Sequence, residues 1–214
     1  MTETAEDRKI ARRRSPRFDL IAGNVCLDFV NTLDDRYIKP KELLDTYADL
    51  ACFAEDSGLL DSRQVGRLLS RSQAEPERAQ QVLVRGRELR EAIHEVFWAI
   101  IHKRPTPPAA LARLNADVQS VAGHMLLVPE KGAFAWNFDD LKALESVLWP
   151  IARAAADLLT SDQLPYVRAC FSKTCEWFFL DTSKNHHRRW CDMTRCGNRA
   201  KVQRFYARQK KAGS

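Results

Sequence analysis

Four of the six cysteines lie near the C-terminus and are spaced in two pairs. Four residues separate Cys170 from Cys175, four separate Cys191 from Cys196, and fifteen residues lie between the pairs. Zn²⁺ binds four thiolates at the corners of a tetrahedron, and two short loops that each supply two sulfurs commonly provide them. Because four protein ligands leave no position for water, the spacing predicts one structural Zn²⁺ rather than a catalytic metal.

Three alternatives to a four-cysteine zinc site remain open at this point. The cysteines could form two disulfides or be four unrelated core residues. Disulfides are disfavoured because the N-terminus is charged rather than signal-like, and a reducing cytoplasm keeps thiols free. His186 and His187 lie between the two pairs and could replace a thiolate, although an exposed turn is the simpler interpretation.

The C-terminal segment is too small to fold by apolar burial alone. About fifty residues bury little surface, so metal binding is expected to supply folding free energy on the order of 10 kcal/mol. The apolar run 177–180 is expected to face Trp190 across a turn at 181–185. The order predicted is a cysteine loop, a β-hairpin, a second cysteine loop and a helix whose first turn holds Cys196, which is a treble-clef-like zinc finger.

Positive charge is concentrated in the same segment. Residues 166–214 hold twelve Lys or Arg and three Asp or Glu, whereas residues 18–165 hold sixteen and twenty-two. The first seventeen residues add six basic and three acidic side chains, and the whole chain has a net charge of +6. A basic module beside an acidic body is typical of proteins that bind a polyanion, and nucleic acid is the natural candidate.

The last helix is expected to carry much of this charge. At 100° per residue, positions 201, 204, 208 and 211 form a cationic stripe, and Val202, Phe205, Tyr206 and Gln209 form a neighbouring stripe expected to pack on the hairpin. A solvated charged helix face is the alternative. The candidate nucleic-acid-binding residues are Arg188, Arg189, Asn198, Arg199, Lys201, Arg204, Arg208 and Lys211.

The run Cys-Asp-Met-Thr-Arg-Cys-Gly-Asn-Arg-Ala-Lys-Val at 191–202 closely resembles the CGNR zinc-finger family, named for its Cys-Gly-Asn-Arg motif. Residues 179–183 and 188–191 resemble the hairpin of the same family, and the match includes all four expected cysteines. Residues 27–32, Leu-Asp-Phe-Val-Asn-Thr, resemble the hallmark of the ABATE domain. The resemblance implies a bacterial transcription regulator whose N-terminal helical domain responds to stress or small ligands.

The chain is expected to divide into three parts. Residues 1–17 form a disordered basic tail, residues 18–163 a helical ABATE-like domain, and residues 164–214 the zinc finger. The fold class is therefore mainly α with a small β-hairpin in the N-terminal domain, followed by a treble-clef-like finger of hairpin and helix. No apolar run approaches the roughly 20 residues that span a bilayer, so a cytoplasmic protein that does not contact membranes is expected.

Apolar periodicity predicts the helices of the N-terminal domain. A helix from residue 41 to about 57 is expected to open at Pro40, and long helices are expected over 76–103 and 108–121. A hairpin is expected at 124–138, followed by a helix to about 160 with a kink at Pro150. His94 and His102 are eight residues apart on one helix and are interpreted as incidental.

Asp28 and Asn31 are three residues apart and share one helix face. They could line a ligand pocket, or they could bind nearby backbone groups instead. A small-molecule effector and a homodimer are expectations for this domain.

Three function classes follow from these features. The first is a DNA-binding regulator, in which Lys201, Arg204 and Arg208 contact phosphates while Asn198 and Arg199 lie nearer the bases. The second is an RNA-binding protein that stacks unpaired bases on Trp190, Phe205 or Tyr206. The third is a protein-interaction module that uses the same basic face. An enzyme is not expected, because the chain lacks phosphate-loop and hydrolase motifs.

Overall fold

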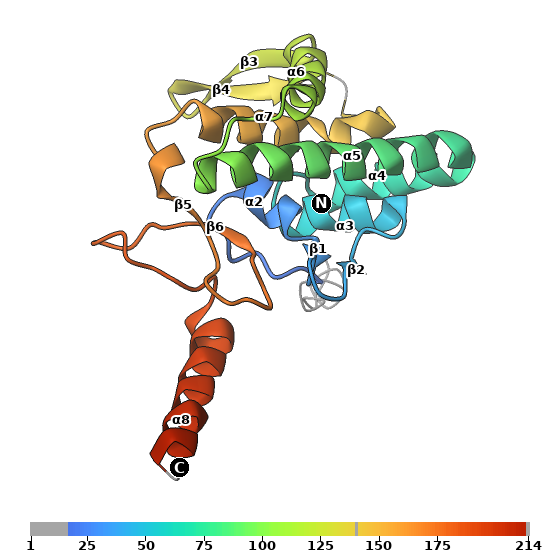
Figure 1. Ribbon diagram of the computed structural model, residues 1–214. Helices are drawn as coiled ribbons and strands as arrows, with labels where there is room; N and C mark the ends of the chain where they lie inside the picture. Colours follow the sequence, from blue (N-terminus) through green and yellow to red (C-terminus); the bar gives the residue numbers. More distant parts are fainter. Residues whose placement is uncertain (1–16, 140, 213–214) are drawn as a thin grey trace, which may run out of the picture.

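Helix α5 (Pro76–Ile101) is the element around which the helices of the N-terminal domain pack in the computed structural model (Figure 1). It contacts α2, α3, α4 and α6, and α7 packs against α2 and α6. The structure describes residues 17–139 and 141–212, so the predicted basic tail lies almost wholly outside the described residues. The other helices are α2 (Val25–Val30), α3 (Tyr47–Asp56), α4 (Ser62–Ala74), α6 (Pro108–Ala122), α7 (Trp149–Leu159) and α8 (Asn198–Ala212).

Helix α3 begins later than the sequence predicts. A two-stranded ladder of β1 (Leu33–Asp34) and β2 (Lys41–Glu42) occupies the expected first turn after Pro40. The helix begins at Tyr47 because Thr46 and Asp49 form a capping box, in which each side chain accepts from the other's backbone N–H.

The buried side chain of Arg90, on α5, holds β2 in place. Only 3% of Arg90 is exposed, and its guanidinium donates to both carboxylate oxygens of Glu42 at 2.6 and 2.7 Å and to Thr32 Oγ1 at 3.2 Å. Burial raises the pKa of Glu42, but the hydrogen bonds from Arg90 outweigh it and lower the pKa. This ion pair fixes β1, whose Asp34 faces the C-terminal module.

The predicted hairpin is confirmed as β3 (Met125–Glu130) paired antiparallel with β4 (Ala133–Phe138). The predicted kink at Pro150 is wrong. A 3₁₀ turn at Leu144–Val147 precedes α7, and Pro150 lies in the first turn of that helix, where its missing N–H costs nothing.

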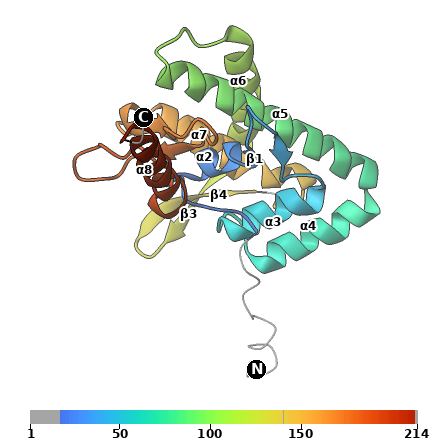
Figure 2. The same ribbon diagram turned by 60° about the horizontal axis from the view of Figure 1, so that its bottom comes forward.

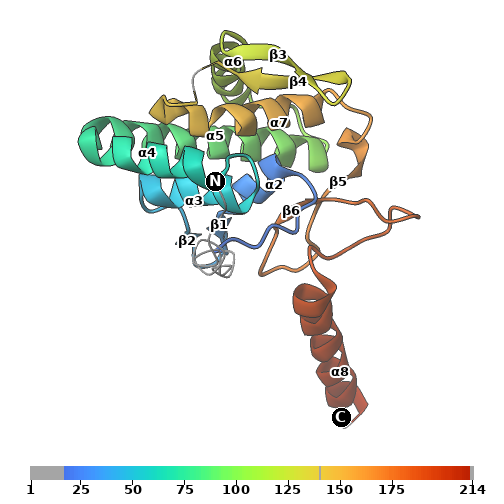
Figure 3. The ribbon, with the colours of Figure 1, turned by 180° about the vertical axis from the view of Figure 1, so that it is seen from behind.

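In the C-terminal module the hairpin differs from the one predicted. Strand β6 (Phe178–Leu180) pairs with β5 (Val167–Ala169) rather than facing Trp190. The first cysteine loop therefore forms the tip of the hairpin, and the run after residue 180 is a loop. Figure 3 shows β5 and β6 lying directly below the helical domain. The treble-clef-like order of hairpin and helix is confirmed.

Helix α8 extends away from the rest of the molecule (Figures 1 and 3), and in Figure 2, where the bottom of Figure 1 comes forward, it lies in front of the helical domain. Val202, Phe205 and Tyr206 are exposed by 53%, 58% and 64%, so the prediction that this stripe packs on the hairpin is wrong. The physical reason is that β6 already packs against α2. No helix among the described residues is both long and apolar enough to span a bilayer.

Candidate metal centre and basic surface

The four cysteine sulfurs converge at one point of the C-terminal module. All four lie within 4.8 Å of one another, with Cys175 Sγ 3.5 Å and Cys196 Sγ 3.6 Å from Cys191 Sγ. A tetrahedron with Zn–S bonds of about 2.3 Å has sulfur–sulfur separations of about 3.8 Å. None of the four is in a disulfide. The geometry fits one Zn²⁺ with four thiolate ligands and no open position.

The electrostatics of the cluster also favour a bound cation. Burial, followed by the charge of the Cys170 sulfur, raises the pKa of the Cys196 thiol, and the proximity of Cys170 raises the pKa of Cys175. Four thiolates this close repel one another, and a bound divalent cation offsets that repulsion.

Two short turns present the sulfurs. The first loop closes at the hairpin end, where the backbone N–H of Cys170 donates to the Trp177 carbonyl at 2.8 Å. In the second loop, the Asp192 carboxylate accepts a hydrogen bond from the N–H of Thr194. A single π-helical turn at Met193–Gly197 then leads into α8. Cys196 thus lies just before α8 rather than in its first regular turn.

The loop between β6 and the second cysteine pair closes on Asp181. Its carboxylate accepts from the N–H and hydroxyl of Ser183 and, at 2.9 Å, from the N–H of Arg188. His186 stacks on Tyr166, with ring centroids 3.8 Å apart, and its Nδ1 lies 2.9 Å from the Asp181 carbonyl oxygen. His186 is therefore held in the loop, and among the described residues the group of side chains close enough to share a metal consists of the four cysteines.

The N-terminal domain binds the strand that follows the first cysteine pair. The Asn31 side chain donates to the Phe178 carbonyl at 2.9 Å and accepts from the Phe178 N–H at 3.0 Å. Two residues further along, Leu180 N–H donates to the Ala22 carbonyl at 2.7 Å. Gly23, which follows Ala22, has φ +77°, a backbone conformation that a residue with a Cβ adopts only under strain.

Asp28 supports the same junction from within α2. Its carboxylate accepts from the Ala22 N–H at 2.8 Å, and burial raises its pKa to about 6. Both Asp28 and Asn31 therefore bind backbone groups, as the alternative interpretation expects, while ligand binding at these residues stays a prediction.

Further contacts between the domains involve residues that the sequence analysis did not assign to a site. Trp177 Nε1 donates to Asp34 at 2.8 Å, and Arg195 forms an ion pair with Asp19. His94, which does not belong to the metal cluster, stacks on Phe178 with ring centroids 5.1 Å apart. Nothing in the local sequence signals these contacts, since each partner lies far away along the chain.

Arg188 and Arg189 are adjacent in the chain but have different surroundings. The Arg188 guanidinium lies over Phe179 at 4.5 Å, donates to the carbonyls of Trp190 and Cys191, and reaches the Ile21 carbonyl at 3.4 Å. Arg189 is exposed and lies over Phe171 at 4.2 Å. Only the second of these adjacent arginines is available to a partner.

The residues of the Cys-Gly-Asn-Arg motif beyond the ligand also have partners within the module. Asn198 donates to the Thr194 carbonyl at 3.0 Å, and Arg199 donates to Thr174 Oγ1 at 3.0 Å, which ties α8 to the first cysteine loop. Lys201 is exposed. The side chains of Arg204, Arg208 and Lys211 lie outside the described residues.

Comparison with protein families assigns both parts of this architecture. Residues 23–162 match the ABATE family, described as "Putative stress-induced transcription regulator", and residues 166–209 match the CGNR zinc finger. The chain belongs to the ABATE family and ends in a CGNR zinc finger that holds one structural Zn²⁺ through Cys170, Cys175, Cys191 and Cys196. Neither family is an enzyme family. Among curated proteins, none matches the chain.

Proposed function

We propose that the protein is a zinc-dependent, nucleic-acid-binding transcription regulator of the cytoplasm, without catalytic activity, in which α8 docks on duplex DNA. The observation that carries this proposal is the position of α8. It extends clear of an acidic body (Figure 1), while its first turn is anchored beside the zinc site by Arg199 and Asn198. A helix presented in this way has the dimensions and charge to enter a DNA groove.

Sequence positions support the proposal further. Positions 201, 204, 208 and 211 of α8 are all Lys or Arg and lie within one stripe of the helical backbone. Phosphate contacts from such a stripe hold a helix on the duplex without reading its sequence.

The proposal gives the N-terminal domain a ligand-sensing or dimerisation role. A change at α2 would reach the zinc module directly, because Asn31 and Ala22 bind β6. Coupling of this kind needs two states that the effector distinguishes.

The test is the salt dependence of binding to random duplex DNA, measured with the full-length zinc-loaded protein. Five phosphate contacts predict a log–log slope of about 4–5. Replacing Arg204 and Arg208 together by Ala should lower this slope by about 2 while leaving zinc content unchanged. Arg63 and Arg67 on α4 are exposed and have the same spacing, so their double Ala variant is the matched control and should leave the slope unchanged.

Other results would favour the alternative functions. Duplex affinity that is independent of salt would overturn the proposal. Stronger binding to structured RNA than to DNA would favour an RNA-binding protein. If the protein binds an acidic protein but no nucleic acid, the result would favour a protein-interaction module.

A further inference from the structure

Phe171 is a large aromatic side chain held in an exposed position. It directly follows the zinc ligand Cys170, and 64% of it is accessible to solvent. Its backbone N–H donates to the Arg189 carbonyl at 2.9 Å, which joins the first cysteine loop to the segment before the second. The exposure of Phe171 is therefore built into the zinc module and does not arise from a loose loop.

The groups around Phe171 suit a flat, negatively charged partner. The Arg189 guanidinium lies over the ring at 4.2 Å, and Trp190 meets the ring nearly perpendicularly, with centroids 5.8 Å apart. Arg189 and Lys173 are themselves exposed. Aromatic rings beside cations bind both the π faces and the phosphates of a nucleic acid.

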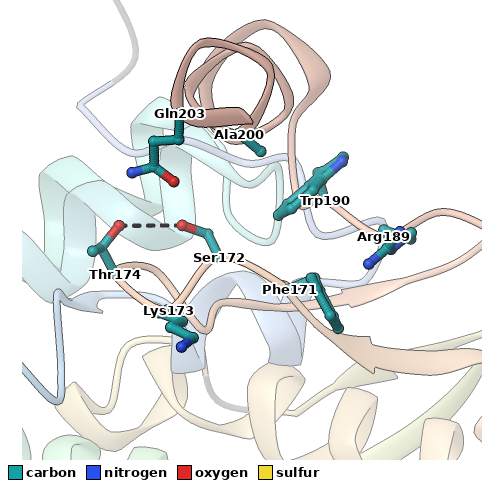
Figure 4. Close-up of a pocket in the computed structure, with 8 residues that line it drawn as sticks. All are labelled: Phe171, Ser172, Lys173, Thr174, Arg189, Trp190, Ala200 and Gln203. Carbon is teal, nitrogen blue, oxygen red and sulfur yellow. Dashed lines mark hydrogen bonds between the residues drawn. The ribbon is translucent and has the colours of Figure 1, made fainter. Parts of the chain in front are cut away.

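A hollow of about 520 Å³ opens between these rings and the start of α8. Figure 4 shows Phe171 and Trp190 on one side of it, and Ser172 and Thr174 facing Gln203 on the other. These hydroxyl and amide groups can donate to or accept from the polar atoms of a base. No carboxylate is among the described residues that line it.

A second hollow, of about 370 Å³, adjoins the first at the first cysteine loop and shares Phe171, Ser172 and Lys173 with it. It is also lined by Arg168 and by Trp98 and His102, whose rings stack with centroids 4.4 Å apart. Trp98 is 36% exposed, and Glu176 is the single carboxylate among the described lining residues. Aromatic rings and cations thus alternate across two adjoining hollows.

We propose that this surface, formed by Trp98, Arg168, Phe171, Lys173, Arg189 and Trp190, binds an unpaired nucleic-acid strand whose bases stack on Phe171. The proposal rests on the proposed nucleic-acid binding and adds a second site, beside the duplex site on α8, that binds an unpaired strand. A closed duplex keeps its bases stacked inside, so it cannot use an exposed ring without local opening. A single strand offers both its base faces and its phosphates, which are the two chemistries present here.

The experiment compares a labelled single strand of about 12 nucleotides with the matched duplex, using full-length zinc-loaded protein. Replacing Phe171 by Ala should weaken single-strand binding by about 5- to 150-fold, which corresponds to the loss of about 1–3 kcal/mol for one stacked base. Duplex binding should change by less than about twofold. Replacing Phe171 by Trp preserves a stacking ring and should retain single-strand affinity, whereas Phe171→Leu should behave like the Ala variant.

Phe134→Ala is the matched control, because Phe134 is 73% exposed on the β3–β4 hairpin, on the far side of the helical domain from α8 (Figure 1). It should leave both affinities unchanged, and the zinc content of each variant checks that the module is intact. A strand carrying 2-aminopurine reports stacking independently, because its fluorescence falls when the base stacks and should recover in Phe171→Ala.

Equal weakening of duplex and single strand by Phe171→Ala would overturn the inference, as would unchanged single-strand binding. In either case salt-dependent duplex binding would leave the proposed function intact. If the wild-type protein binds neither form, both proposals fail together.

Discussion

The zinc module has two faces that differ in how its aromatic and charged side chains are used. The docked face consists of Trp177, Phe178, Arg188 and Arg195, and each of these side chains contacts the N-terminal domain. The open face consists of Phe171, Lys173, Arg189, Trp190 and α8. There the large side chains Phe171, Phe205 and Tyr206 are more than half exposed.

The difference shows that residue type alone does not indicate a partner surface. Both faces carry arginines that lie over aromatic rings, and Arg188 and Arg189 are adjacent in the chain. The Arg188 guanidinium donates to carbonyl groups of the chain itself, so replacing Arg188 should lower the stability of the folded protein. Arg189 is exposed, so its loss should affect binding.

The largest expected effect comes from removing the ion that supports both faces. Cys175→Ser should abolish zinc binding and cost the module folding free energy on the order of 10 kcal/mol. Because Asn31 and His94 pack on β6, thermal unfolding of the helical domain should also shift to lower temperature, whereas the sequence alone predicts loss of the C-terminal module only. Metal content and a calorimetric scan measure these effects.

Cys52→Ser is the control, and it should retain zinc because Cys52 lies outside the cluster. A Cys175→Ser protein with a full complement of zinc would contradict the ligand assignment.

The next largest effect should come from the docked face. Asn31→Ala leaves the N–H and the carbonyl of Phe178 buried without their partner, at a cost of about 3 kcal/mol. Asn137→Ala on the exposed hairpin should change the free energy of unfolding by less than about 0.5 kcal/mol. Denaturant titration measures both, and equal stability of the two variants would show that the junction is not formed in solution.

A matched pair of arginine variants separates the two faces most directly. Arg188→Ala should destabilise the protein by about 2 kcal/mol through lost hydrogen bonds and ring contact. Arg189→Ala should leave stability within about 0.5 kcal/mol but reduce the salt slope of single-strand binding by about 0.7. If Arg189→Ala lost stability and Arg188→Ala lost only binding, the two faces would be wrongly identified.

The smallest expected effect is a pH dependence at the docked face. Burial lowers the pKa of His94 from 6.5 to about 4, so the folded state binds fewer protons than the unfolded state in that range. The folding stability that comes from keeping His94 neutral is fully present above pH 6.5 and is lost as the pH falls towards 4. The expected loss is about 2 kcal/mol after a discount for partial exposure. Denaturant titration of wild type and His94→Phe from pH 7 to 4 should show the stability of the wild type falling by about 2 kcal/mol relative to the variant, since the variant keeps a ring without a titrating group.

Asp28 shifts in the opposite direction and is common to both proteins, so it cancels in this comparison. Its pKa, raised to about 6 by burial, contributes stability at low pH that is lost as the pH rises from about 4 to 6. Parallel stability curves for the two proteins would contradict the assignment to His94.

Sequence patterns predicted what depends on local spacing. The apolar periodicity of α5 and α6, the β3–β4 hairpin and the four cysteines were each visible as short-range signals. The start of α3 was missed because the Thr46–Asp49 capping box and the Glu42–Arg90 ion pair outweighed the signal from Pro40. The position of Pro150 was misjudged because a proline fits the first turn of a helix as well as a kink.

The docked face could not be predicted, because its contacts join distant parts of the chain. Asn31 and Phe178 are 147 residues apart, and Arg195 and Asp19 are 176 apart. The open face was predicted only in part. The cationic stripe of α8 follows from helical spacing, but the exposure of Phe171 and of the second α8 stripe depends on what β6 packs against.

The two hydrogen bonds of Asn31 have a consequence for how copies of this protein behave toward one another. A two-stranded ladder normally leaves a row of unpaired N–H and C=O groups along each edge, and these groups can bind a third strand from another chain. On β6 three groups of that row have partners, because the Asn31 amide binds the N–H and carbonyl of Phe178 as a neighbouring peptide unit would, and the Ala22 carbonyl accepts from the N–H of Leu180. The Asn31 side chain thereby protects this edge of β6 against strand addition and aggregation.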